Sequence, residues 1–160
     1  YPDCKDKRSF ETGMEFQDFV VQTLAQQSII LQNLVSKKFQ YTVGENLQGF
    51  EIKYDSRCTD TGRLSIEIAE KSRAYLPNYT KSGIYRDDNT WLYVQGNYQI
   101  LFIFPKNYLQ YLHKSGKYEE YTMPTIKKFY LSFNEATKYA AKVIDLRQWL
   151  VGFVAVGLAS

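Results

Sequence analysis

Two segments of the chain alternate strictly between apolar and polar residues. In residues 50–55 the order is Phe50, Glu51, Ile52, Lys53, Tyr54 and Asp55. Successive side chains of a β-strand point to opposite faces, so this segment is predicted to be a strand with one apolar and one charged face. Residues 64–69 repeat the pattern, with Glu67 on the polar face. Residues 60–62, Asp-Thr-Gly, are a turn signal between the two segments, which predicts a hairpin with Glu51 roughly opposite Glu67.

A long amphipathic helix is predicted before these strands, over residues 12–36. Thr12 and Glu15 have the spacing of a capping box, with Thr at the N-cap and Glu at the third helical position. Apolar residues follow at broadly helical spacing, namely Phe16, Phe19, Val20, Leu24, Leu31, Leu34 and Val35. Residues 1–11 are polar and are expected to be loose, and the alternation at residues 39–43 predicts a short strand.

The second half of the chain is predicted to contain further strands and two short helices. The expected elements are a hairpin of strands 91–94 and 98–104, a helix at 105–113, a strand at 126–131 and a helix that starts after Ser132 and includes Val143 and Ile144. Gly96-Asn97 suits the turn of the hairpin, and Pro105 suits the first position of the helix that follows it. Residues 72–90 are rich in turn-forming residues and are expected to be largely loop.

This order of elements predicts a mixed α/β (α+β) fold in a single domain, residues 1–160, with a central mixed β-sheet flanked by helices. A chain of 160 residues is long enough to bury a core of its own. The apolar run at 148–160 is shorter than the roughly 20 residues that a membrane-spanning helix needs. We therefore interpret it as a buried or partner-covered segment and expect no membrane association.

Charge and cysteine content bound the partners and the compartment. The net charge of +3 is mildly basic, and the fourteen Tyr and ten Phe residues permit a nucleic-acid partner without requiring one. Cys4 and Cys58 are too few and too isolated for a disulfide framework, which favours a cytoplasmic protein.

The sequence also excludes several kinds of active site. His113 is the one histidine of the chain, which rules out a multi-histidine zinc site within one molecule. Glycine-rich phosphate-binding loops and a serine nucleophile elbow are absent from the sequence, and no organic cofactor is expected. An enzyme built from this chain would therefore use carboxylates, lysines and a hard metal ion.

Glu51 and Lys53 are the residues best suited to that chemistry, because they share the charged face of one predicted strand. Two carboxylates can hold Mg²⁺ through their oxygens, and the metal then acidifies a water and contacts phosphate oxygens. A lysine beside them can position that water or neutralise developing charge. The second acid would be Glu45, shortly before the strand, or Glu67 on the other strand. A solvated outer strand face is the alternative interpretation of the same charges.

The segment 47–53, Leu-Gln-Gly-Phe-Glu-Ile-Lys, resembles the PD-(D/E)xK nuclease superfamily, the fold of many restriction enzymes. It is particularly similar to the Gly-apolar-Glu-apolar-Lys core of the mismatch-repair nicking endonuclease and its restriction-enzyme relatives. The resemblance implies a restriction-endonuclease-like fold and a DNA endonuclease that depends on Mg²⁺, with Mn²⁺ as a substitute. Double-strand cutting by folds with a single site commonly uses two copies, so a homodimer is also implied.

Two alignments to the family's motif are open. In the first, Glu51 and Lys53 take the Glu-x-Lys positions, and Glu45 replaces the upstream Asp. In the second, Glu51 takes the upstream position and Glu67 is the acid of the second strand. The family's lysine position then falls on Ala69, and Lys53 or Lys71 would have to take its role. Many members carry a Glu in the first helix near the metal, and Glu15 matches that placement. The alternative function is a protein of this fold that binds nucleic acid or a partner without cutting.

Overall fold

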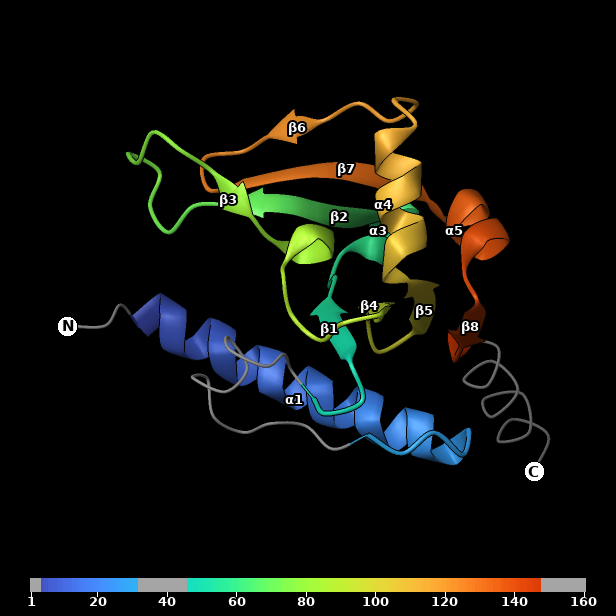
Figure 1. Cartoon of the computed structure of the whole chain (residues 1–160). Helices are drawn as coiled ribbons and strands as arrows, with labels where there is room; N and C mark the ends of the chain where they lie inside the picture. The colour runs from blue at the N-terminus through green and yellow to red at the C-terminus, as the bar shows by residue number, and fades with distance from the viewer. Residues whose placement is uncertain (1–3, 32–45, 148–160) are drawn as a thin grey trace.

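The computed structural model describes residues 4–31 and 46–147 (Figure 1). Its elements are α1 (Cys4–Gln26), β1 (Phe50–Tyr54), α3 (Cys58–Thr61), β2 (Arg63–Glu70), β3 (Thr80–Lys81), the 3₁₀ helix η1 (Gly83–Tyr85), β4 (Leu92–Gly96), β5 (Ile100–Pro105), α4 (Lys106–Lys114), β6 (Tyr121–Thr122), β7 (Ile126–Ser132), α5 (Phe133–Tyr139) and β8 (Lys142–Asp145). Helices and strands are interleaved along the chain, so the predicted mixed α/β class is confirmed.

Within the described residues, the strands form two four-stranded sheets. The first has the order β1-β4-β5-β8, with β1 parallel to β4 and the other neighbours antiparallel, so it is a mixed sheet. The second has the order β3-β2-β7-β6 and is antiparallel throughout. Figure 1 shows the second sheet above the first, with α1 beneath β1 and α4 upright, from the level of β5 to that of β6.

Apolar side chains cover both faces of the first sheet. One face packs against α1, in a core that contains Phe16, Val20 and Leu24 of the helix and Phe50, Ile52, Val94, Leu101 and Ile103 of the strands. The other face packs against the second sheet, α4 and α5, in a larger core that contains Tyr93, Phe102, Phe104, Leu64, Ile66, Leu109, Phe129 and Leu131. Each large side chain buried in this way contributes about 1.5–3 kcal/mol. The two cores therefore hold the first sheet between α1 and the second sheet.

The predicted hairpin of residues 50–55 and 64–69 is wrong, although both segments are strands. β1 pairs with β4, whereas β2 pairs with β3 and β7 in the other sheet. The chain passes between the sheets through α3, whose Cys58 is buried in the larger core and whose end is formed by Gly62 at φ 69°. Burial raises the pKa of the Cys58 thiol to about 12, so this cysteine serves packing rather than nucleophilic chemistry.

The first helix begins and ends earlier than predicted. Residues 4–11 are helical rather than loose, and Thr12 lies inside the helix instead of capping it. The early residues lack an apolar pattern, but Lys, Arg and Glu have good helix propensity, which favours a helical backbone there. The helix ends at Gln26, and Ser28 at φ 62° turns the chain so that Leu31 still packs in the α1 core.

The elements predicted for the second half are present, apart from the end of the last helix. The segments 91–94 with 98–104, 105–113 and 126–131 form β4–β5, α4 and β7. Ser132 caps α5 as predicted, because its side-chain oxygen accepts a hydrogen bond from the Glu135 amide. The helix ends at Tyr139, however, and Val143 and Ile144 lie in β8, which pairs with β5. Such β-branched residues suit a strand packed on one face better than a helix end.

Several predictions fall outside the described ranges, namely those for residues 1–3, the helix end at 32–36, the strand at 39–43, the acid Glu45 and the apolar segment 148–160. Among the helices in the described part of the chain, none is long and apolar enough to cross a membrane.

Candidate functional site

The charged face of β1 is turned toward the interior of the protein. Phe50 and Ile52 pack against α1, so Glu51 and Lys53, which alternate with them, point to the side where the second sheet lies. Glu51 stands opposite Tyr93 of β4 and is 2% exposed, while the side chain of Lys53 is 29% exposed. The predicted division of the strand into two faces is confirmed, but the charged face is buried at Glu51 rather than solvated.

A short turn before β1 fixes which residues point inward. The side-chain amide of Asn46 donates to the carbonyl oxygen of Phe50 at 2.6 Å, and its side-chain oxygen accepts from the Phe50 amide at 2.8 Å. Gly49 adopts φ 79° in this turn, and a Cβ at this position would lie 2.6 Å from the carbonyl oxygen of Asn89. Glycine is therefore required by both conformation and space. The turn sets the phase of the strand and with it the inward direction of Glu51.

The carboxylate of Glu51 is buried without hydrogen bonds. No described residue donates a hydrogen bond to either of its oxygens. Lys53 Nζ lies 3.2 Å from Glu51 Oε1, which is an ion-pair contact but lacks hydrogen-bond geometry. Taking a charged carboxylate out of water costs on the order of several kcal/mol, and buried carboxylates are normally hydrogen-bonded, paired or bound to a metal. The contact with Lys53 thus compensates the negative charge of Glu51 only in part.

A second cation, Arg86, lies in the loop after η1. The buried Lys106 holds this loop, because its Nζ donates to the Arg86 carbonyl oxygen and pairs with the Asp88 carboxylate. Burial lowers the pKa of the Arg86 guanidinium, but neighbouring negative charges outweigh that effect and raise the pKa above its usual value. These charges belong to Glu51, Glu70, Glu67 and Asp88. Glu51 and Glu67 therefore lie near the same guanidinium, although their strands belong to different sheets.

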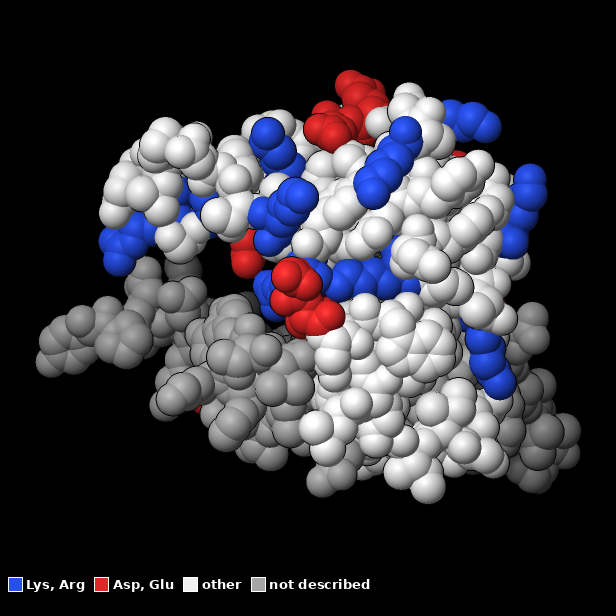
Figure 2. Space-filling model, in the orientation of Figure 1, with Lys and Arg blue, Asp and Glu red and all other residues white. Residues whose placement is uncertain are grey.

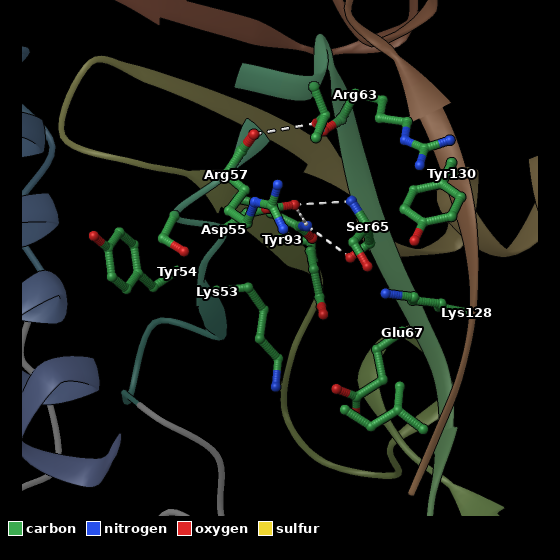
Figure 3. A pocket seen from close by; sticks show the side chains of 14 residues that line it. Lys53, Tyr54, Asp55, Arg57, Arg63, Ser65, Glu67, Tyr93, Lys128 and Tyr130 are labelled. Atoms are coloured by element: carbon green, nitrogen blue, oxygen red, sulfur yellow. Dashed lines mark hydrogen bonds between the residues drawn. The ribbon is translucent and has the colours of Figure 1, made fainter. Parts of the chain in front are cut away.

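Glu67 projects from β2 and is held by the residues that precede η1. The buried Ser82 hydroxyl donates to Glu67 Oε1 at 2.5 Å. Gly83 packs so closely that a Cβ there would lie 2.2 Å from the Glu67 carbonyl oxygen. Lys53 and Glu67 line the same pocket, and Figure 3 shows their side chains extending into it from opposite walls. The structure thus brings Lys53 and Glu67 to one site without pairing their strands.

The pocket, of about 490 Å³, lies between the end of β1 and the side of β2 and β7 that points away from the larger core (Figure 3). Its charged lining consists of the cations Lys53, Arg57, Arg63 and Lys128 and the carboxylates Asp55 and Glu67. Asp55 Oδ2 already accepts hydrogen bonds from the Ser65 amide at 2.8 Å and the Gln95 side chain at 3.0 Å. The pocket therefore carries an excess of positive charge. Lys and Arg side chains also predominate over the second sheet and α4 on the face that Figure 2 shows.

The other residues predicted for the site do not join it in the described structure. Glu15 is exposed on α1, and α1 covers the face of the first sheet opposite to the one that carries Glu51. Glu45 lies outside the described residues. Among residues 4–31 and 46–147, no group of three or more His, Cys, Asp or Glu side chains is arranged to hold a metal ion. Glu51 and Glu67 are the predicted acids whose charges both raise the pKa of the Arg86 guanidinium.

Three residues that the sequence pattern did not single out shape the site. Arg86 adds a cation, Ser82 orients Glu67, and Gln95 links the sheets by donating to Asp55 and to the Ser65 carbonyl oxygen. The first two come from the loop-rich segment 72–90, where no periodicity indicates which way a side chain points. Comparisons with protein-family models, with curated proteins and with solved structures found no match to this chain.

Proposed function

We propose that this chain is a metal-dependent DNA endonuclease whose site consists of Glu51, Lys53, Glu67 and Arg86. The observation that carries the proposal is the Glu51 carboxylate, which is 2% exposed and receives no hydrogen bond from a described residue. The resemblance of segment 47–53 to PD-(D/E)xK nucleases and the excess of cations in the adjoining pocket support it. A homodimer and a cytoplasmic location belong to the same proposal.

A divalent cation would compensate the buried charge of Glu51. Mg²⁺ is commonly held by one or two carboxylates together with waters and substrate phosphates, so it does not require a cluster of three protein acids. Glu51 and Glu67 both act on the Arg86 guanidinium, and we infer that they are the two acids. This choice corresponds to the second alignment with the family's motif. Glu45 remains the candidate of the first alignment.

The side chains of the proposed site have separable roles. When bound, Mg²⁺ would supply a water of lowered pKa and polarise a phosphate oxygen. Glu51 and Glu67 would hold the ion through their oxygens. Lys53, whose Nζ lies 3.2 Å from Glu51 Oε1, would donate a hydrogen bond to the attacking water or to a phosphate oxygen. Arg86 would neutralise the negative charge that develops on the phosphate.

The alternative is a protein that binds nucleic acid without cutting it. The contact between Lys53 and Glu51 favours this interpretation, because an ion pair can compensate a buried charge without a metal. The two functions differ in one property, hydrolysis of the phosphodiester in the presence of a divalent ion.

We expect the wild-type chain to cut DNA in Mg²⁺ or Mn²⁺ and not in EDTA, and the Lys53→Ala variant to cut about 10²–10³ times more slowly. The side chain of Lys53 is 29% exposed, so its truncation removes little packing, but it also leaves the buried Glu51 carboxylate without its ion-pair contact. Rates are therefore compared for the folded fraction, which circular dichroism measures. The measurement is the cleavage rate on supercoiled, linear and branched DNA, with each substrate tested in Mg²⁺, Mn²⁺ and EDTA.

Lys117→Ala is the matched control, because Lys117 is exposed after α4 and does not line the pocket. A wild-type chain that cuts none of these substrates in either ion would refute the endonuclease proposal and favour the non-cutting alternative. A Lys53→Ala variant that cuts as fast as Lys117→Ala would exclude Lys53 from the reaction.

A further inference from the structure

We propose that the pocket beside Glu51 and Lys53 receives an unpaired nucleotide of the DNA strand, with Arg63 and Lys128 contacting the phosphate next to the one that is cut. The inference rests on the proposed function, because it names the form of the substrate that the same site takes. Three features of the described residues carry it: an excess of positive charge, a stacked arginine and the size of the pocket.

The positive charge of the pocket is available to an anionic ligand. Arg57, Arg63 and Lys128 line it, and none of them forms an ion pair with another described residue. Asp55 and Glu67 keep their charge when they accept hydrogen bonds from neutral groups, so they offset two of the four cations in the lining and leave an excess of two. Cations gathered without carboxylate partners repel one another unless an anion lies between them, and a phosphate group is the anion that DNA supplies.

Arg63 is held in the geometry that suits a phosphate. Its guanidinium carbon lies 3.7 Å from the ring centroid of Tyr130, and Lys128 Nζ lies 5.0 Å from the same centroid. Tyr121 meets Tyr130 edge-on at 5.1 Å, which fixes the ring. A guanidinium stacked on an aromatic ring keeps its N–H donors at its edges, where a phosphate can accept two of them at once. The stacking restricts the side chain before the ligand arrives, so less conformational entropy is lost on binding.

The size of the pocket selects a single strand. A pocket of about 490 Å³ lies in the range of small-molecule sites, so it has room for a nucleotide but not for a base-paired duplex. Tyr130 lies in its wall, and aromatic side chains bind unpaired bases of any sequence by stacking, whereas the Tyr54 ring packs on the α1 side against Phe16 and Tyr98. A base that stays paired and stacked in a duplex has no free face for such a ring. Single-stranded or branched DNA with an unpaired nucleotide therefore fits the pocket.

The test is binding of a fluorescent single-stranded thymidine 20-mer and of a duplex of the same length, followed by anisotropy in EDTA at several salt concentrations. We expect the wild-type chain to bind the single strand more tightly than the duplex. Arg63→Ala should weaken single-strand binding about tenfold and reduce the slope of log affinity against log salt by about 0.7, the value for one lost phosphate contact on a single strand. Arg73→Ala, which removes an exposed arginine outside the pocket, should change neither.

Equal binding of the single strand and the duplex, or equal affinities and salt slopes for Arg63→Ala and Arg73→Ala, would overturn the inference. Because EDTA excludes cleavage, the result is independent of catalysis. A chain that binds single strands with the expected Arg63 dependence but never cuts DNA would support this pocket assignment while refuting the endonuclease proposal. A chain that cuts DNA but whose binding is insensitive to Arg63 would support the endonuclease proposal and refute this pocket assignment.

Discussion

The Glu51→Gln variant is expected to lose metal-dependent cleavage while remaining at least as stable as the wild-type chain. The substitution keeps the shape of the side chain and removes a charge that is buried without hydrogen bonds. The cations it leaves behind retain contact with water, because the side chains of Lys53 and Arg86 are 29% and 23% exposed. We expect the free energy of unfolding to rise or to stay within about 1 kcal/mol, and the cleavage rate to fall at least about 10²-fold.

Glu70→Gln is the matched control for that variant. It removes another carboxylate that contacts Arg86, at 3.3 Å, but its side chain is 44% exposed and does not line the pocket. Denaturant unfolding and cleavage rates measured on both variants separate a site residue from a structural ion pair. A loss of about 3 kcal/mol or more in Glu51→Gln would identify the pair with Lys53 as a structural element of the fold.

The Gly83→Ala variant is expected to lose about 2–4 kcal/mol of stability, more than any of the variants that remove a charge. Gly83 has φ 55°, which a residue with a side chain rarely adopts, and its Cβ would lie 2.2 Å from the Glu67 carbonyl oxygen. The backbone of either η1 or β2 must therefore move to make room for the methyl group. This displacement would disturb Glu67 and the hydrogen bond that it accepts from Ser82. Thermal unfolding followed by circular dichroism measures the loss, and cleavage by the folded fraction should also fall.

Gly62→Ala separates the effect of conformation from the effect of space. Gly62 has φ 69°, close to that of Gly83, but no atom lies within 4 Å of its added Cβ. The Gly62→Ala substitution should lower the free energy of unfolding by about 1 kcal/mol, which is the conformational penalty alone. If Gly83→Ala were no more destabilised than Gly62→Ala, the close packing of η1 against β2 would be incorrect.

The alternation of residues 50–55 predicted the strand and its two faces, because side-chain direction in a strand depends on local geometry alone. The partner of that strand could not be predicted. The turn signal at residues 60–62 suggested a hairpin, but α3 occupies the connection and carries β2 into a different sheet. Strand pairing depends on which long-range contacts bury the most apolar surface, and the burial of Cys58 in the larger core is not visible in a local pattern.

The candidate site, too, could be predicted only in part from the sequence. Glu51, Lys53 and Glu67 were found because charged residues at alternate positions of a strand are readily recognised in a sequence. Arg86 and Ser82 come from a segment without periodicity, and their directions are set by contacts such as that of Lys106 with the Arg86 carbonyl oxygen. The burial of Glu51 also exceeds what the pattern indicated, since alternation alone does not distinguish a charged face in water from one beneath a second sheet.

The most direct measurement of the central claim, that Glu51 holds a divalent ion for phosphodiester cleavage, is Mn²⁺ binding followed by electron paramagnetic resonance. The wild-type chain, Glu51→Gln and Glu70→Gln would be titrated in the presence of a saturating phosphorothioate oligonucleotide, which supplies phosphates that resist hydrolysis. We expect the wild type and Glu70→Gln to bind Mn²⁺ with a clear saturation point, and Glu51→Gln to lose that binding. A wild-type chain that binds no Mn²⁺, or a Glu51→Gln variant that binds it as tightly as the wild type, would contradict the assignment.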